Sequence, residues 1–233
     1  MSDYYRPQTA FTFFPPVIKN LLILNGILFL AQNVVQMTQA IGLATVLNAM
    51  ALYPIGAGPE GYSIFGTAIT VPGFQIWQVV TYGFLHGGIG HLFFNMFALW
   101  MFGVQIEQDW GSRRFAIFYF VCVIGAAAAQ LAVTYGAPIS VPTIGASGGV
   151  FGILLAFGMM YPDRPIYFIL IPIPIKAKYF VTFYGLVELY SGVARTGTGV
   201  AHFAHLGGML FGFLLILYWR GKLPIKPKVY FRW

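Results

Sequence analysis

Long apolar runs dominate the chain, and six of them are candidates for membrane-spanning helices. They cover residues 17–35, 87–106, 115–135, 147–161, 179–193 and 200–219. A spanning helix needs about 20 mainly apolar residues, with a range of roughly 17–25, so the fourth and fifth runs are short for this purpose. The pattern predicts an all-α membrane protein, built as a bundle of six transmembrane helices.

Two segments between the runs are apolar but repeatedly interrupted by glycine and proline. Proline removes a backbone donor and clashes with the preceding helical turn, so neither segment can be one continuous helix. We expect residues 36–78 to form a long first loop at the membrane interface, with a short helix at 41–53 lying in its plane. We expect residues 166–175 to form an extended interfacial connection.

The composition excludes a water-soluble domain. The chain is 58% apolar and only 8% charged, whereas soluble domains carry roughly 25% charged residues. No charged or Ser/Gly-rich linker divides it, so we expect one domain at residues 17–219. Residues 1–16 and the basic residues 220–233 would form cytoplasmic tails. Cys122, the single cysteine, lies inside an apolar run, and we expect it to be a buried small hydrophobe.

The basic residues are distributed unevenly around the six runs. If successive loops alternate between the two membrane faces, Arg195 lies on one face and the other Lys and Arg residues, 12 of 13, lie on the opposite face. The positive-inside rule then places both termini in the cytoplasm. These charges lie at the ends of apolar runs and form no cluster with aromatic residues. We therefore expect contact with a lipid bilayer and no nucleic-acid partner.

A serine flanked by glycines opens the fourth run, in the stretch Gly-Ala-Ser-Gly-Gly-Val-Phe-Gly at residues 145–152. In the predicted topology Ser147 lies at the outer end of its helix. A serine hydroxyl is a weak nucleophile unless a base such as histidine accepts its proton. The first N–H groups of a helix have no partner within it, so those beside Ser147 could stabilise an oxyanion. Gly145 and Gly148 would allow a tight turn and the close approach of a substrate.

Further polar residues are predicted at the depth of this serine. A single histidine or asparagine in a membrane helix often only binds a neighbouring helix, but several at one level indicate a functional site. The chemistry that such a group supports is acyl transfer. His91 and Asn95, four residues apart, could donate to one oxyanion, while spacing leaves open whether His202 or His205 is the base. The residues at this level are His86, His91, Asn95, His202 and His205.

Small residues recur at four-residue spacing in the fourth and sixth runs. This pattern lets membrane helices approach closely, and a short contact between the serine and a histidine would need such an approach. Packing alone could also explain it. The residues are Gly148, Gly152 and Ala156 in the fourth run, and Gly208 and Gly212 in the sixth.

Four motifs occur in a fixed order between residues 77 and 219. They are His86 with His91-Leu-Phe-Phe-Asn95, then Glu107-x-x-x-Gly111-Ser112, Gly145-Ala146-Ser147-Gly148, and Ala204-His205-x-x-Gly208-x-x-x-Gly212. In this order they resemble the rhomboid family of intramembrane serine proteases. The resemblance implies a six-helix rhomboid-like bundle and hydrolysis of peptide bonds in or near transmembrane segments of membrane-protein substrates. It implies no cofactor and no metal.

The resemblance also implies roles for individual residues. Ser147 would be the nucleophile and His205 the general base of a dyad without aspartate, because Gly208 and Gly212 match the family pattern after this histidine. His91, Asn95 and the Ser147 backbone N–H would form the oxyanion hole. Some members carry a tyrosine four residues after the serine, stacked on the histidine; Phe151 stands there in this chain, and its ring could pack against the imidazole. The residues expected to support the site are His86, His202, Gly145, Gly148, Phe151 and Gly208.

Two other readings remain open. One is a catalytically inactive rhomboid-like protein that binds membrane proteins, although such members lose the serine or the histidine. The other is a metal-dependent enzyme or transporter that uses the histidines, but the chain has no His-Glu-x-x-His stretch and no carboxylate near them in sequence.

Glu188, in the fifth run, could pair with Arg195, line a cavity or serve packing alone. Compactness and the lack of a targeting segment suggest a bacterial plasma membrane. The oligomeric state stays open.

Overall fold

The structure is a computed structural model, and it describes residues 12–56, 60–61, 70–71, 73–136, 142–167, 173–194, 201–227 and 230. The helices are α1 (Pro16–Thr38), α2 (Ile41–Met50), α3 (Gln78–Thr81), α4 (Ile89–Trp110), α5 (Ser112–Val133), α6 (Ser147–Met160), α7 (Ala177–Val193) and α8 (His202–Trp219), with a 3-10 turn, η1, at Tyr82–Phe84. Two antiparallel pairs of short strands join β1 (Glu60–Gly61) to β2 (Thr70–Val71) and β3 (Pro165–Ile166) to β4 (Ile175–Lys176).

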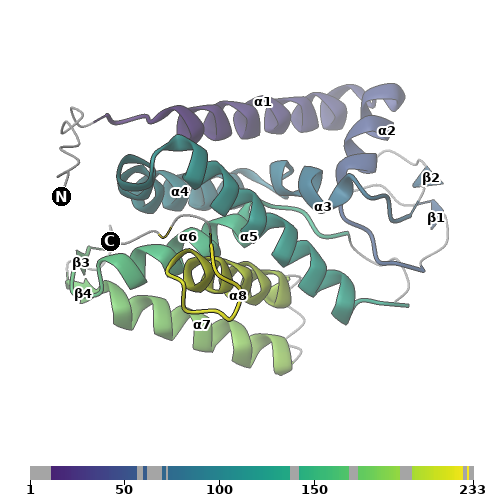
Figure 1. The fold of residues 1–233 in the computed structure, drawn as a ribbon. Helices are drawn as coiled ribbons and strands as arrows, with labels where there is room; N and C mark the ends of the chain where they lie inside the picture. Colours follow the sequence, from purple (N-terminus) through teal and green to yellow (C-terminus); the bar gives the residue numbers. More distant parts are fainter. Residues whose placement is uncertain are drawn as a thin grey trace.

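Each of the six apolar runs coincides with one helix, namely α1, α4, α5, α6, α7 or α8. Successive members of this set run in opposite directions (Figure 1). By length and composition α1, α4, α5 and α8 can cross a membrane, whereas α6 and α7 have only 14 and 17 residues. The predicted all-α membrane fold is confirmed, while six complete crossings stay a prediction.

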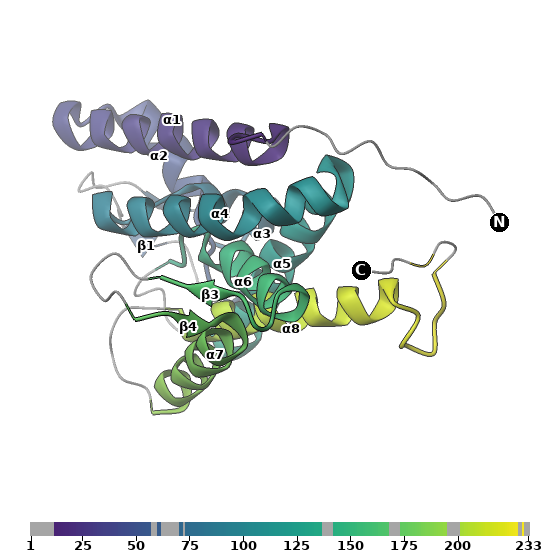
Figure 2. The same ribbon diagram turned by 90° about the vertical axis from the view of Figure 1, so that its left-hand side faces the viewer.

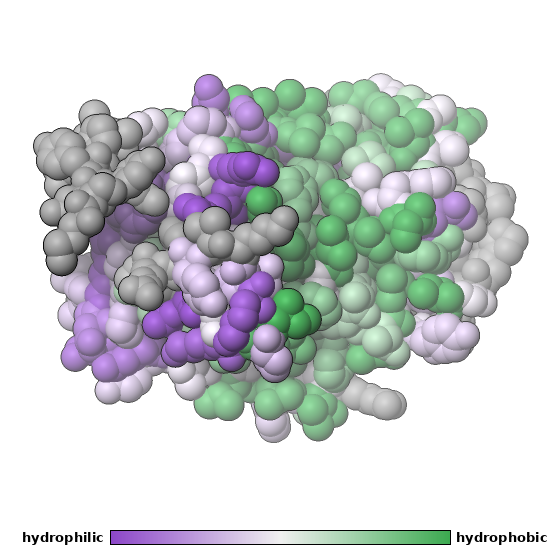
Figure 3. Space-filling view, viewed as in Figure 1, coloured by the Kyte–Doolittle hydropathy of each residue, from purple (hydrophilic) through white to green (hydrophobic). Residues whose placement is uncertain are grey.

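The outside of the bundle is apolar. Figure 3 shows hydrophobic residues across the middle of one face, with hydrophilic residues at the end that holds the start of α1 and the β3–β4 hairpin. Many large apolar side chains are exposed, among them Leu30, Phe94, Phe183 and Leu186. Exposing such surface to water costs about 25 cal/mol per Å², and lipid removes this cost. The protein is therefore an integral membrane protein.

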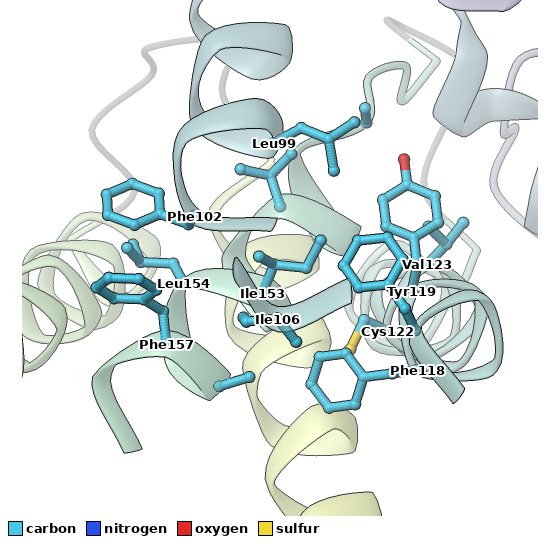
Figure 4. Close-up of a cluster of buried hydrophobic side chains, with 14 of the residues drawn as sticks. Leu99, Phe102, Ile106, Phe118, Tyr119, Cys122, Val123, Ile153, Leu154 and Phe157 are labelled. Carbon is cyan, nitrogen blue, oxygen red and sulfur yellow. The ribbon is translucent and has the colours of Figure 1, made fainter. Parts of the chain in front are cut away.

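Helix α6 is at the centre of the bundle and contacts α4, α5, α7 and α8, while α5 and α8 also pack directly against each other (Figures 1 and 2). Ile153 and Ala156 of α6 are fully buried, and so is Cys122 of α5, as expected from the sequence. Figure 4 shows the cluster in which α6 side chains meet Leu99 and Phe102 of α4. Because its neighbours enclose it, α6 holds its first residue, Ser147, at a fixed position in the bundle.

The predicted interfacial loop contains the short helix α2, which ends at Met50 rather than at residue 53. Buried Gln78 accepts a hydrogen bond from the Tyr53 N–H (3.2 Å) and donates one to the Gly73 carbonyl (3.0 Å). The Trp77 indole N–H donates to the Ala49 carbonyl at 2.9 Å. The residues just after α2 are thus hydrogen-bonded to residues at the start of α3, so the two described ends of the loop have defined positions.

The connection between α6 and α7 begins and ends as an extended hairpin, in which Ile166 pairs with Ile175. This agrees with the extended connection predicted at 166–175, of which residues 168–172 lie outside the described ranges. Asp163 accepts a hydrogen bond from Lys178 (2.8 Å) and contacts Lys176 (3.2 Å). Hydrogen bonds from these two ammonium groups hold the pKa of Asp163 below its usual range.

A buried carboxylate joins the start of α1 to the end of α4. Glu107 accepts hydrogen bonds from the N–H groups of Val17 and Ile18, both at 2.9 Å, and from the Ser112 hydroxyl at 2.6 Å. The first N–H groups of a helix lack partners within it and favour negative charge. This anchor lies in the last turn of α4, which extends past its predicted end at residue 106.

We predict that Glu107→Ala destabilises the protein by about 3 kcal/mol, because three donors lose a charged acceptor in a buried place. The measurement is a thermal unfolding curve in detergent. Asp163→Asn, which removes the exposed ion pairs, is the control and should change the melting temperature little. Equal melting temperatures for the Glu107 variant and the wild type would contradict the anchoring role.

Candidate active site

The site begins with a contact between Ser147, the first residue of α6, and His205, in the first turns of α8. The Ser147 Oγ atom lies 2.7 Å from the Nε2 atom of His205, within hydrogen-bond distance. The imidazole is buried and the serine is half-buried. Of the two histidines that spacing leaves open, it is His205 that contacts the serine.

This contact depends on the close approach of α6 and α8. A Cβ atom on Gly208 would lie 2.0 Å from the carbonyl oxygen of Gly148, so only glycine fits at this position. The small-residue pattern therefore does bring the two helices together here. Gly212 behaves differently, because a Cβ there would meet Cys122 and Phe118 of α5, each at 3.0 Å. The second glycine of the α8 pattern thus serves packing against α5, not against α6.

The loop that leads into α6 is held from two directions. Leu52, in the first loop, forms an antiparallel bridge with Thr143 through hydrogen bonds of 3.0 and 2.9 Å. The Gly145 N–H donates to the Tyr82 carbonyl at 3.0 Å. Gly145 adopts φ +127°, a conformation that other residues rarely adopt. The backbone before Ser147 is consequently fixed in a turn that requires glycine.

His91 lies against this turn. Its Nδ1 atom accepts a hydrogen bond from the Gly87 N–H at 3.2 Å, so in the neutral ring the proton is on Nε2. A Cβ placed on Gly145 would lie 2.8 Å from that Nε2 atom and 3.7 Å from the Ser147 Oγ atom. Among the described residues this N–H makes no hydrogen bond, and it lies against Gly145, two residues before Ser147.

Asn95 is placed less directly. Its side-chain amide donates to the carbonyl of His91, four residues earlier, at 2.9 Å. Among the described residues Asn95 makes no hydrogen bond to Ser147. The structure places Asn95 one helical turn from His91, buried, with one of its two amide hydrogens already used within α4.

Phe151 and His86 pack against the two histidines nearest the serine. The Phe151 ring stacks on His205, with centroids 4.2 Å apart and planes 9° from parallel, as the sequence led us to expect. The His86 ring meets His91 edge-on at 5.0 Å. Gln32 of α1 fixes the His86 backbone by donating to its carbonyl (2.8 Å) and accepting from its N–H (3.1 Å).

Glu188 of α7 contacts two histidines, and the sequence analysis did not predict this. Its Oε2 atom lies 2.6 Å from Nδ1 of His202 and 3.0 Å from Nδ1 of His205. No sequence spacing reveals this, because Glu188 precedes the histidines by more than a dozen positions and meets them only where α7 packs against α8. Arg195, the partner considered from sequence, lies outside the described residues.

These groups form one connected arrangement at the end of the bundle where α4, α6 and α8 begin and α7 ends. It contains a hydroxyl, an imidazole in contact with it, the N–H of His91 against the preceding Gly145 turn, and a carboxylate that contacts the imidazole from the other side. The first N–H groups of α6 add further donors next to the hydroxyl. Such a set can activate a nucleophile and stabilise negative charge on a reacting oxygen.

A family model described as a rhomboid domain matches residues 73–222, well over half of the chain. The chain belongs to the rhomboid family. RHOMBOID-like protein 4 of Arabidopsis thaliana is 35% identical over 62% of the chain, and Rhomboid-like protease 3 of Toxoplasma gondii is 29% identical over 66%. Inactive RHOMBOID-like protein 8 of Arabidopsis thaliana is 33% identical over 34%. Rhomboid relatives thus include proteins named as proteases and proteins named as inactive.

The chain is short beside these rhomboid relatives. It covers 34% of RHOMBOID-like protein 4, 56% of Rhomboid-like protease 3 and 22% of Inactive RHOMBOID-like protein 8. What the match shows is therefore the rhomboid domain. All four motifs that carry the sequence resemblance lie within the matched residues.

We predict that Gly208→Ala separates α6 from α8 and breaks the Ser147–His205 contact. The rate at which a fluorophosphonate labels Ser147 should fall at least about tenfold, because an unactivated serine reacts slowly. Gly26→Ala in α1 is the matched control, since nothing lies within 4 Å of a Cβ there and alanine is the better helix former. Equal labelling of both variants would refute the requirement for close approach.

Proposed function

We propose that this protein is an intramembrane serine endopeptidase that hydrolyses peptide bonds in or near transmembrane segments of other membrane proteins. The observation that carries the proposal is the 2.7 Å contact between the Ser147 hydroxyl and the His205 imidazole. The contact lies at a helix start, where unpaired N–H groups are available. Membership of a family that includes named proteases supports the same class of activity.

In the proposed mechanism Ser147 and His205 act as a dyad. As the serine oxygen attacks the substrate carbonyl carbon, His205 Nε2 accepts the hydroxyl proton. The same proton then passes to the leaving amine, and an acyl-enzyme ester on Ser147 remains. Water, deprotonated by His205, then attacks the ester carbonyl. As the bond between the acyl carbon and the Ser147 oxygen breaks, His205 returns the proton to that oxygen and the acid is released. Phe151 keeps the imidazole in one plane by stacking on it throughout this cycle.

The oxyanion of each tetrahedral intermediate would be stabilised by fixed donors. His91 offers its Nε2–H beside the Gly145 turn, and the Ser147 N–H is one of the first groups of α6. Asn95 would contribute the amide hydrogen that its bond to the His91 carbonyl leaves free. Donors already held in place cost no reorganisation when charge develops, which is the basis of this type of catalysis.

The substrate class follows from the location of the site among membrane helices. A helical substrate segment has its carbonyls hydrogen-bonded internally, so it must unwind locally to reach Ser147. Helix-weakening residues near the cleaved bond should therefore favour hydrolysis. For the chain as a whole we propose six spans within residues 17–219, with both tails cytoplasmic, in a bacterial plasma membrane.

A metal-dependent hydrolase is the second candidate, and one observation favours it. Glu188, His202 and His205 offer three ligand atoms within 4.8 Å of one another. Against it, His202 Nδ1 and Glu188 Oε2 are 2.6 Å apart, which is a hydrogen-bond distance, whereas two ligands of a tetrahedral zinc ion lie about 3.3 Å apart. Activity that a chelator abolishes and a fluorophosphonate leaves intact would favour the metal enzyme.

An inactive membrane-protein binder is the third candidate, since one relative is named inactive. Family members of this kind lose the serine or the histidine. Ser147 and His205 are both present and in contact in this chain, which supports an active enzyme. The direct comparison is cleavage by the wild type against its variants.

We predict that Ser147→Ala and His205→Ala each lower the rate of cleavage of a labelled single-span substrate by at least about 10³-fold. The nucleophile and the base act as one unit, so the loss of either removes most of the catalysis. The measurement is product formation in reconstituted liposomes. Cys122→Ser, a buried change in the same bundle, is the control for effects on folding alone. Cleavage that survives Ser147→Ala would sink the protease assignment.

We predict that His91→Phe keeps the ring packing against His86 but lowers kcat roughly 10²- to 10³-fold by removing one oxyanion donor. KM should change little, since the donor acts on charge that develops only in the transition state. Steady-state kinetics with the same substrate test this. A change confined to KM would show that His91 binds substrate instead.

A further inference from the structure

A single carboxylate oxygen lies behind both histidines of α8. Oε2 of Glu188 is 2.6 Å from Nδ1 of His202 and 3.0 Å from Nδ1 of His205. The Glu188, His202 and His205 side chains are only 10, 14 and 10% exposed. Buried polar groups interact strongly because little water screens them, so the contacts of Glu188 with the two histidines matter for the charge of each.

Within the described ranges, no group competes with Glu188 for the Nδ1 atom of His205. It makes no well-formed hydrogen bond among the described residues, and its 3.0 Å contact with Glu188 is in the range of an ion pair. A carboxylate oxygen at that distance favours the ring form with a hydrogen on Nδ1. In that form Nε2 carries the lone pair, and Nε2 is the atom that faces the Ser147 hydroxyl at 2.7 Å.

The same carboxylate stabilises the positive charge that His205 acquires when it acts as a base. When an imidazole accepts a proton it becomes a cation, and nearby negative charge lowers the free energy of that cation. The other groups that face His205 do not supply this charge: Ser147 and Phe151 are neutral, and His91 and His202 would add only positive charge. Among the described residues Glu188 is the one anion in contact with His205.

We propose that Glu188 is a positioning residue that acts on Ser147 through His205. Its carboxylate is supplied by α7 rather than by α6 or α8, the helices that carry the dyad. Glu188 selects the ring form of His205 that can accept the serine proton, and it stabilises the protonated imidazole. His202 holds the carboxylate in place through its 2.6 Å contact. The inference rests on the proposed protease function and deepens it.

A consequence is that α7 is part of the active site. Helices α6 and α8 are held together at Gly148 and Gly208, but α7 contributes its carboxylate only while it packs against α8. A displacement of α7 would leave the Ser147–His205 contact in place and remove the negative charge behind it. The reactivity of the serine therefore depends on the position of α7.

The test compares two substitutions that separate charge from shape. Glu188→Gln keeps the size of the side chain and loses the charge, whereas Glu188→Asp keeps the charge and shortens the side chain. We expect kcat to fall roughly 10- to 100-fold in Glu188→Gln with KM unchanged, and to fall less in Glu188→Asp. This is smaller than the loss of about 10⁴ on removing the charge of a triad aspartate, because the His205 contact is not a well-formed hydrogen bond. The rate of Ser147 labelling by a fluorophosphonate should fall in parallel.

Glu107→Gln is the matched control, because Glu107 is also a buried carboxylate but lies in the anchor of α1. It should lower the melting temperature and leave kcat of the folded enzyme unchanged. If Glu188→Asp loses more activity than Glu188→Gln, or if Glu188→Gln retains wild-type kcat, Glu188 serves packing and the inference is wrong. Wild type that cleaves no substrate overturns the protease function and this inference together. If the wild type cleaves the substrate, Ser147→Ala abolishes cleavage and Glu188→Gln leaves it unchanged, the inference alone is overturned.

Discussion

The backbone contact between α6 and α8 at Gly148 and Gly208 is the constraint on which the rest of the site depends. A carbonyl oxygen occupies the space that any side chain on Gly208 would need. Because this contact fixes the distance between the two helix axes, it also fixes the distance between a serine on one and a histidine on the other. Lipid provides little hydrophobic drive for helix association, so close packing of small residues has to supply it.

Around that contact each neighbouring element contributes one chemical property. Helix α4 brings the His91 donor against the Gly145 turn, α6 brings a hydroxyl and unpaired N–H groups, and α7 brings a negative charge behind the base. The first loop fixes the backbone that leads into α6, through the bridge between Leu52 and Thr143. A site assembled in this way needs no single long rigid element, because each group is held by a different neighbour.

The sequence was sufficient for features that are local or that repeat with helical spacing. The start of α6 at Ser147, the burial of Cys122 and the Gly148–Gly208 approach follow from apolar runs and four-residue patterns. The role of Gly212 and the partner of Glu188 could not be predicted. Both depend on which helix packs against α8 at that point along its length. Packing between helices that are distant in sequence produces no periodic pattern in the sequence itself.

The anchor at Glu107 has a consequence for the order of assembly. The N–H groups of Val17 and Ile18 find their acceptor on a residue about ninety positions later in the chain. These two hydrogen bonds can therefore form only after α4 has been synthesised, and the Ser112 hydroxyl joins them from the start of α5. The anchor is thus one of the most distant contacts along the chain, and forming it carries the entropic cost of closing a loop of about ninety residues.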